Sequence, residues 1–260
     1  MRAIPFSKFT ACGNDFLIVE GSYADDIAAL SRRLCDRHNG IGADGVEWLF
    51  SATAADIEAR LINADGSAAE ISGNGTRCVA AALCSEQPQE RITIKTGAGV
   101  KTCVLTARSE VGFEFEIAMG QPRLDGELKL QLVAGEVSGS RVSIGNPHFV
   151  VFVGDFPANW RKLGREIGAR PEFEHGVNIE FVSLRDSGEL EVRFFERGVG
   201  ETQSSGTGSC AAAVATIAKG RAQSPVTVNA PGGSQVVRWD DQIYLRGWAH
   251  LICKGEFFCE

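Results

Sequence analysis

Two alanine-rich segments of this chain are introduced by the same glycine-rich turn, and this repetition constrains the fold more than any other feature of the sequence. The first turn, at residues 72–76, reads Ser-Gly-Asn-Gly-Thr, and the second, at residues 205–209, reads Ser-Gly-Thr-Gly-Ser. The copies lie 133 residues apart, about half of the 260-residue chain. One such turn could arise by chance, but two at this spacing indicate an internal duplication. We therefore expect two similar lobes, each built around one of these helices.

The charge and hydropathy of the chain favour a small molecule as its partner. The formal net charge is -7 and no basic run is visible, which argues against binding to nucleic acid or to an anionic membrane. No stretch approaches the roughly 18 apolar residues of a membrane span, and the N-terminal segment lacks the apolar core of a signal peptide. We therefore expect a cytoplasmic protein that binds a small-molecule substrate.

The eight cysteines and four histidines do not form a pattern typical of disulfides or of a metal site. No Cys-x-x-Cys pair is present, and a chain of this length in a reducing compartment does not need disulfides. We predict no metal site, and we expect most cysteines to be small buried apolar residues. Cys78 and Cys210, which follow the two glycine-rich turns, are expected in the core, although they are also the thiols nearest to those turns.

Alternation of apolar and polar residues predicts many short, largely antiparallel strands. The expected strands are Ile57–Asn63, Arg91–Thr96, Val100–Ala107, Phe113–Met119, Phe149–Val153, Val177–Leu184, Leu190–Phe195, Val226–Asn229, Gln235–Trp239 and Gln242–Leu245. The expected helices are Asp25–Arg37, which should stop at Asn39-Gly40, Thr76–Leu83, Trp160–Ile167 and Ser209–Ala218. The fold class that follows is α/β (α+β), with two pseudo-symmetric lobes that each wrap a mostly antiparallel sheet around a central helix.

Each glycine-rich turn has the composition of an anion-binding helix start. A Gly-x-Gly turn exposes backbone N–H groups next to the positive end of the helix dipole. Neither copy ends in the Gly-Lys-Ser/Thr of a phosphate-binding loop, and neither fits the Gly-x-Gly-x-x-Gly of a dinucleotide-binding unit. A nucleotide phosphate is therefore a poor candidate, and a carboxylate suits the turns better.

Two interpretations of the turns stay open at this point. Either copy alone could be a tight strand-to-helix turn in which Ser72 or Ser205 is only the helix N-cap. The duplication favours a functional interpretation, because two facing helix starts would place polar groups on both sides of one cleft. A pair of groups on opposite faces of a bound carbon is what stereoinversion requires, since one group removes a proton and the other delivers one.

At these residues the chain resembles the diaminopimelate epimerase family, and the similarity extends over essentially its whole length. Seven blocks match in the family's order: Ala11–Phe16, Cys35–Arg37 with Gly40–Gly45, Asn63–Ser67, Gly73–Cys78, Gly145–His148, Gly176–Phe181 and Glu196–Thr202. The resemblance implies a cofactor-independent amino-acid epimerase that interconverts LL- and meso-diaminopimelate for lysine and peptidoglycan synthesis. It also implies a homodimer and two α/β lobes, which we expect at residues 1–117 plus 247–260 and at residues 118–246.

The resemblance implies a role for each matching polar residue. The side chains that hold the substrate would be those of Asn14, Asn63, Asn146, Asn178, Glu196 and Arg197. The backbone donors for the reacting carboxylate would lie at Gly73, Asn74, Gly206 and Thr207. Asparagines suit this task because each offers a donor and an acceptor without titrating. Backbone N–H groups at a helix start would stabilise the charge that develops as the α-carbon loses its proton.

The chain departs from the family at the two residues that would move the proton. In the family both are cysteine, and here they are Ser72 and Ser205. The resemblance implies His148 as the acid/base partner of Ser72 and Glu196 as that of Ser205. A thiol with a pKa of about 8.5 readily forms a thiolate at a helix start. A serine hydroxyl needs an adjacent base. Three alternatives therefore stay open: an epimerase of weak or lost activity whose cysteines were replaced, a paralogue that epimerises or dehydrates another amino or hydroxy acid, and a non-catalytic amino-acid binder.

Overall fold

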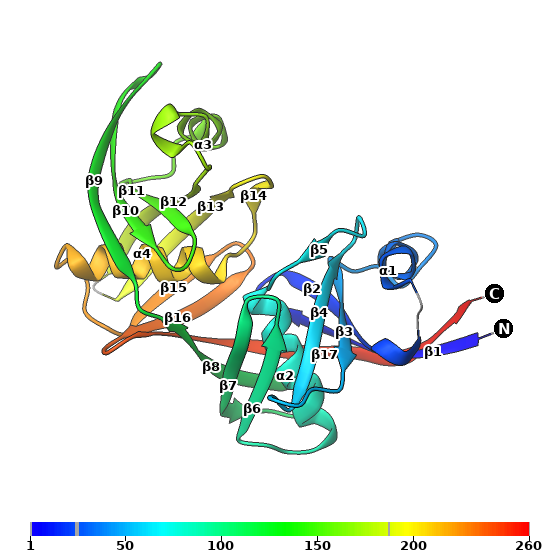
Figure 1. Cartoon of the computed structure of the whole chain (residues 1–260). Helices are drawn as coiled ribbons and strands as arrows, with labels where there is room; N and C mark the ends of the chain where they lie inside the picture. The colour runs from blue at the N-terminus through cyan, green and yellow to red at the C-terminus, as the bar shows by residue number, and fades with distance from the viewer. Residues whose placement is uncertain (1, 24–25, 187, 260) are drawn as a thin grey trace. The chain divides into compact units, whose positions relative to one another are not determined.

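The chain forms two compact units in a computed structural model that describes residues 2–23, 26–186 and 188–259. Unit 1 comprises residues 1–117 together with 246–260, and unit 2 comprises residues 118–245 (Figure 1). Because unit 1 is built from both ends of the chain, strands β8 (Gly112–Gly120) and β17 (Ile243–Cys259) have residues in both units.

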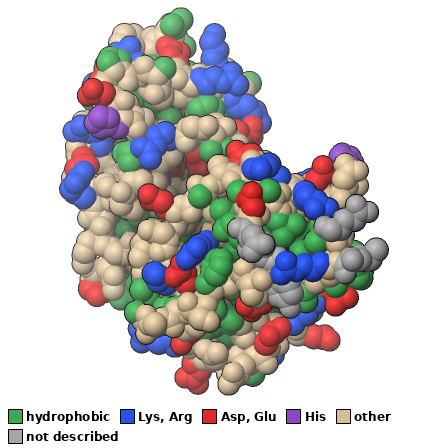
Figure 2. Space-filling model, turned by 45° about the vertical axis from the view of Figure 1, so that its right-hand side comes forward, with side chains coloured by type: hydrophobic (Ala, Val, Ile, Leu, Met, Phe, Trp, Pro, Cys, Tyr) green, Lys and Arg blue, Asp and Glu red, His purple; other side chains and the backbone are tan. Residues whose placement is uncertain are grey.

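The surface mixes charges of both signs. On the face drawn in Figure 2, Lys and Arg side chains and Asp and Glu side chains both occur over most of the surface. Among the described residues, no helix is both long and apolar enough to cross a membrane.

Unit 1 is a closed β-barrel that surrounds one helix. Its elements are β1 (Arg2–Ala11), β2 (Asn14–Glu20), η1 (Gly21–Tyr23), α1 (Ile27–Cys35), β3 (Gly45–Phe50), β4 (Ile57–Asn63), β5 (Ala68–Ala69), α2 (Gly73–Glu86), β6 (Arg91–Thr96), β7 (Gly99–Arg108), β8 and β17. Strand pairing runs β1–β2–β3–β4–β6–β7–β8–β17 and returns to β1. Most of α2 is buried inside this barrel, and its small apolar residues allow the surrounding strands to pack closely against it.

Helix α1 covers the outside of β3. Val46 and Trp48 of β3 belong to the same apolar cluster as Leu34 of α1, and Trp48 Nε1 donates a hydrogen bond to Ser31 Oγ at 2.8 Å. Since side chains of a strand alternate between its faces, the side chain of Glu47 points the other way, toward α2. Strand β3 is therefore covered on both faces.

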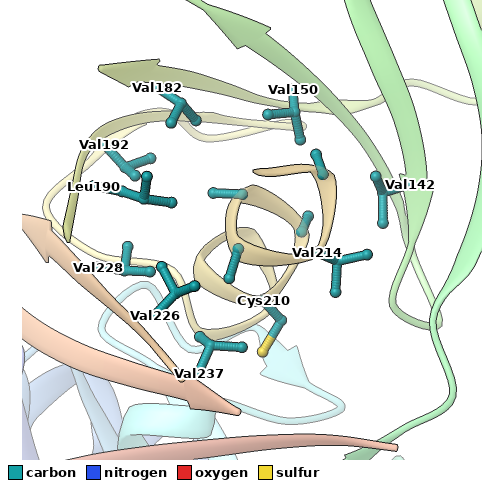
Figure 3. Close-up of a cluster of buried hydrophobic side chains, with 14 of the residues drawn as sticks. Val142, Val150, Val182, Leu190, Val192, Cys210, Val214, Val226, Val228 and Val237 are labelled. Carbon is teal, nitrogen blue, oxygen red and sulfur yellow. The ribbon is translucent and has the colours of Figure 1, made fainter. Parts of the chain in front are cut away.

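Unit 2 repeats this plan. Its elements are β9 (Arg123–Leu132), β10 (Gly135–Ser143), β11 (Pro147–Phe152), α3 (Trp160–Gly168), η2 (Pro171–Phe173), β12 (Asn178–Asp186), β13 (Glu189–Glu196), β14 (Gly200–Thr202), α4 (Gly206–Ala218), β15 (Val226–Ala230) and β16 (Gly233–Trp239). Figure 3 shows α4 surrounded by apolar side chains that point at it from β10, β11, β12, β13, β15 and β16. Helix α3 packs on the opposite face of β12.

The two units repeat each other at a constant spacing. The first residues of α1 and α3, of β3 and β12, and of α2 and α4 are each 133 residues apart. In unit 1, β3 pairs in parallel with the preceding strand β2 and antiparallel with the following strand β4. In unit 2, β12 pairs in the same way with β11 and β13. This confirms the predicted fold class of two duplicated lobes, each with a mostly antiparallel sheet around a central helix.

Several predicted helix ends are wrong. Helix α1 ends at Cys35 rather than at Arg37, because the Asp36 side chain accepts hydrogen bonds from the N–H groups two and three residues further on. The first residue expected for this helix, Asp25, lies outside the described residues. Helices α2 and α4 each begin three residues before their predicted starts, since the serine before each glycine pair caps the helix.

The strand prediction is incomplete. It omits β1, β2, β3, β5, β9, β10 and β14, and it stops the last strand at Leu245, whereas β17 continues to Cys259. Strands β2 and β3 are covered on both faces and therefore show no alternation of apolar and polar residues. The core positions of Cys78 and Cys210 are confirmed, since both are fully buried.

Candidate active site

Ser72 is the N-cap of α2. Its backbone is extended, its Oγ accepts a hydrogen bond from Gly75 N at 3.1 Å, and its carbonyl oxygen accepts one from Thr76 N at 2.8 Å. The cap leaves the N–H groups at the start of the first turn pointing away from the helix, because they have no acceptor within it. A half-buried hydroxyl group therefore lies at the positive end of the buried helix.

Asparagine side chains join this helix start to the β1–β2 turn. Asn74 Nδ2 donates to Asn14 Oδ1 at 2.8 Å, and Asn14 Nδ2 donates to Asp44 Oδ2 at 3.1 Å. The fully buried Arg77 donates a short hydrogen bond to Asn74 Oδ1. Asn63 ends β4, where its Nδ2 donates to Ser67 Oγ at 3.0 Å. The structure thus brings Asn14 and Asn74 into direct contact, whereas Asn63 has a different partner.

Ser205 caps α4 in the same way. It is 7% exposed, and its Oγ accepts a hydrogen bond from Gly208 N at 3.2 Å. Its side chain is also hydrogen-bonded to Glu196, the last residue of β13. Burial raises the pKa of the Glu196 carboxyl above its ordinary value, and the hydrogen bond to Ser205 opposes this shift. A hydroxyl group and a carboxyl group are thus neighbours in unit 2.

His148 is buried in unit 2 and contacts a partner at each ring nitrogen. Its Nδ1 lies 2.7 Å from Glu180 Oε1, and its Nε2 lies 2.9 Å from Asn146 Oδ1. Asn146 Nδ2 in turn donates to Thr207 Oγ1 at 3.4 Å. This row of side chains connects β12 to the start of α4, so the orientation of the imidazole is fixed from both sides.

Asn178 and Arg197 complete the group in unit 2. Asn178 Nδ2 donates to the carbonyl oxygen of Pro147 at 3.1 Å, and Asn178 Oδ1 accepts from the backbone N–H of Arg197 at 3.0 Å. Arg197 Nη1 donates to the carbonyl oxygen of His175 at 2.9 Å. The contacts of the predicted site residues in unit 2 are therefore linked through neighbouring residues of the chain, at Pro147–His148 and at Glu196–Arg197.

The duplication extends to these contacts. In each unit the asparagine of a Gly-Asn turn contacts the side chain two residues after the capping serine, as Asn14 with Asn74 and as Asn146 with Thr207. Equivalent residues thus frame both helix starts. All four of these residues are predicted from the sequence, whereas the contacts between them are seen only in the structure.

Two buried glutamates are absent from the predicted site residues. Glu47 on β3 is 3% exposed and Glu180 on β12 is 1% exposed, and they are 133 residues apart, as the two serines are. A β-carbon built on Gly75 would lie 2.1 Å from Glu47 Oε1, and one built on Gly208 would lie 2.9 Å from Glu180 Oε1. Burial raises the pKa of Glu47 to about 8, and it also raises the pKa of Glu180. The signal in the sequence is a carboxylate between two apolar residues of a predicted or buried strand, repeated at the same spacing.

Each helix start combines the groups that proton transfer from carbon requires. Amide N–H groups and the helix dipole stabilise a carboxylate and the charge that builds up on it. A hydroxyl group beside a carboxyl group can take and return a proton, because the carboxyl group serves as its base. The geometry therefore fits acid/base chemistry on a molecule that bears a carboxylate.

Comparison with known proteins agrees with these observations. The family model described as diaminopimelate epimerase matches residues 6–124 and 140–252. The chain is 39% identical to the diaminopimelate epimerase of Desulforudis audaxviator over 97% of its own length and 98% of that protein. It is 35% identical to the diaminopimelate epimerase of Elusimicrobium minutum over 97% and 98%, respectively.

Solved structures share the fold at low sequence identity. A phenazine biosynthesis protein of the PhzF family from Bacillus anthracis superposes with a TM-score of 0.75 at 16% identity, over the full length of both chains. A hydroxyproline epimerase from Agrobacterium vitis superposes with a TM-score of 0.72 at 17% identity, over 98% of this chain and 92% of that one. At these identities the likeness concerns the fold alone.

Proposed function

Because the chain belongs to the diaminopimelate epimerase family, we propose that it interconverts LL- and meso-diaminopimelate without a cofactor. Ser72 and Ser205 would take the two proton-transfer positions. The observation that carries the proposal is the repeated helix start. Each unit presents the hydroxyl group of a capping serine on a buried helix, and an asparagine contacts the residue two positions after that serine.

The reaction would begin when one serine oxygen removes the α-proton of the substrate and would end when the other hydroxyl returns a proton to the opposite face. The electron pair left on the α-carbon would be delocalised into the carboxylate. Backbone N–H groups at Gly73, Asn74, Gly206 and Thr207 would stabilise this charge, because they lie at the positive ends of α2 and α4.

The distal amino-acid end of the substrate would be held by side chains that are already ordered. Asn14, Asn146 and Asn178 are fixed by hydrogen bonds within their own units. We assign Asn63, Glu196 and Arg197 to the same task, since each ends or follows the strand beside the helix start. Ordered amides bind with little loss of side-chain entropy, which supports selectivity for one substrate.

Incubation with LL-diaminopimelate in deuterated water tests the proposal, with NMR detection of α-deuteration and of the meso product. We expect both signals, at a rate below that of an otherwise identical enzyme with two cysteines, because a hydroxyl is a weaker acid than a thiol. Absence of exchange together with binding seen by calorimetry would identify a non-catalytic binder. Absence of both would point to another amino or hydroxy acid, and a panel of such acids would then be assayed.

We further propose that the protein is a cytoplasmic homodimer, as the family resemblance implies. Sedimentation velocity of the purified chain tests the oligomeric state. A species of twice the 27.8 kDa chain mass is expected, and a monomer at all accessible concentrations would contradict the proposal.

A further inference from the structure

Among the described residues of unit 1, Ser72 has no hydrogen-bonded carboxyl group of the kind that Ser205 has in Glu196. His148, the partner that the family resemblance implies for Ser72, belongs to unit 2. The residue that corresponds to Glu196 in unit 1 is Asn63, an amide that does not titrate and that donates to Ser67. The residue that corresponds to His148 is Phe16, since each pairs with the first residue of the neighbouring parallel strand, β12 for His148 and β3 for Phe16. At the positions of Glu196 and His148, unit 1 therefore has residues that cannot act as an acid or a base.

The third acid/base position keeps its carboxylate. Glu47 corresponds to Glu180, and its side chain points at the first turn of α2. A β-carbon built on Gly75 would lie 2.1 Å from Glu47 Oε1 and 3.2 Å from Ser72 Cβ. The carboxyl group and the serine thus flank the same glycine, and the absence of a side chain at Gly75 leaves room for the carboxyl oxygen.

The surroundings of Glu47 leave its carboxyl group available. Within the described part of the chain it makes no hydrogen bond or ion pair, although it is 3% exposed. Its neighbours in the sheet are Ile18 on β2 and Leu61 on β4. On α2, the ionisable residues closest in sequence to Gly75 are Arg77 and Cys78, and both are buried. Burying an uncompensated carboxyl group is costly, so its presence needs a function.

We propose that Glu47 is the positioning residue that accepts the hydroxyl proton of Ser72. In the epimerisation proposed above, on which this role rests, the α-C–H bond breaks as an Oγ–H bond forms on Ser72. The original hydroxyl proton passes to Glu47 Oε1, and the electron pair stays on the substrate. The sequence of transfers runs in reverse when Ser72 delivers a proton. In the resting state Ser72 Oγ accepts the hydrogen bond from Gly75 N that caps α2, so the proposed transfer requires the hydroxyl group to turn toward the carboxyl group.

The pairing can be tested without substrate. The carboxyl carbon of Glu47 is titrated by NMR in the full-length protein, and Glu47→Gln assigns the signal. Ser72→Ala should shift the midpoint upward, because it removes a polar hydroxyl group beside the carboxylate form, while Ser205→Ala should leave it unchanged. A midpoint that does not respond to Ser72→Ala would overturn the proposal, whether or not the protein turns out to be an epimerase.

The catalytic consequence is tested by a double-mutant cycle. Glu47→Gln should slow α-deuteration of diaminopimelate on the order of 100-fold when residue 72 is serine. In the Ser72→Cys background it should have little effect, because a thiol forms its anion without that base. Equal losses in both backgrounds would show a structural role and overturn the proposal. If Ser72→Ala shifts the titration midpoint of Glu47 but the protein shows no α-deuteration of diaminopimelate, the pairing of Ser72 with Glu47 is supported and the epimerase function is rejected.

Discussion

Glu47 and Glu180 are buried carboxyl groups, and each lies between two apolar residues of its strand. Burial raises the pKa of both, so each favours its protonated form more in the folded protein than in the unfolded one. The folded state therefore binds more protons than the unfolded state between the two pKa values. Stability from this source is fully present below the unfolded pKa and is lost as the pH rises through the folded pKa.

We predict that Glu47→Gln flattens the pH dependence of stability. With a folded pKa of about 8 against an ordinary value of 4.5, the wild type should lose stability as the pH rises from 4.5 to 8. The expected loss is a few kcal/mol, at about 1.4 kcal/mol per pH unit of difference. Urea unfolding at pH 5 and pH 8 measures it. An equal loss in the glutamine variant would show that Glu47 is not the group responsible, since Glu180 and Glu196 remain in both proteins.

At the scale of elements, the helix starts were partly predictable and their contacts were not. The capping serines follow from their position before Gly-x-Gly and an alanine run, because small polar N-caps have a local sequence signature. The site asparagines came from family resemblance alone. Glu47 was missed because its place beside Gly75 depends on the register of β3 and on the packing of α2 inside the barrel. Neither is encoded within a short window of sequence.

A glycine pair in α2 gives a matched test of this packing. A β-carbon at Gly75 would lie 2.1 Å from Glu47 Oε1, whereas one at Gly73 meets no atom within 4 Å. Gly75→Ala should therefore destabilise the fold by about 1–3 kcal/mol. Gly73→Ala should be neutral or slightly stabilising, by up to about 1 kcal/mol, because alanine is the better helix former. Thermal unfolding of both variants compares them, and similar values would contradict the close approach of the carboxyl group to Gly75.

At the scale of the whole molecule, the duplication was predictable because it left the same motif twice in the sequence. The closure of unit 1 was not, because it depends on pairing between strands from opposite ends of the chain. Strand β17 pairs with β1 from Arg2 with Cys259 to Thr10 with His250. Such long-range pairing has no local signal, and β1 was accordingly absent from the predicted strands.

We predict that truncation after Ile252 destabilises unit 1 selectively. It removes the partners of β1 from Arg2 to Lys8, and it uncovers Ile4, which is fully buried. Hydrogen exchange followed by mass spectrometry should show lost protection in β1 and β2, with the strands around α4 unchanged. A uniform loss across both units would mean that they do not unfold separately.

The central claim is that residues 72 and 205 are the two proton-transfer positions of an epimerase. The most direct test compares the rate of conversion of LL- to meso-diaminopimelate by the wild type and by the variant with Ser72→Cys and Ser205→Cys. The account predicts a much faster conversion by the double variant, because each thiol forms an anion far more readily than a hydroxyl at the same helix start. A folded double variant that binds diaminopimelate and does not convert it faster than the wild type would contradict the account.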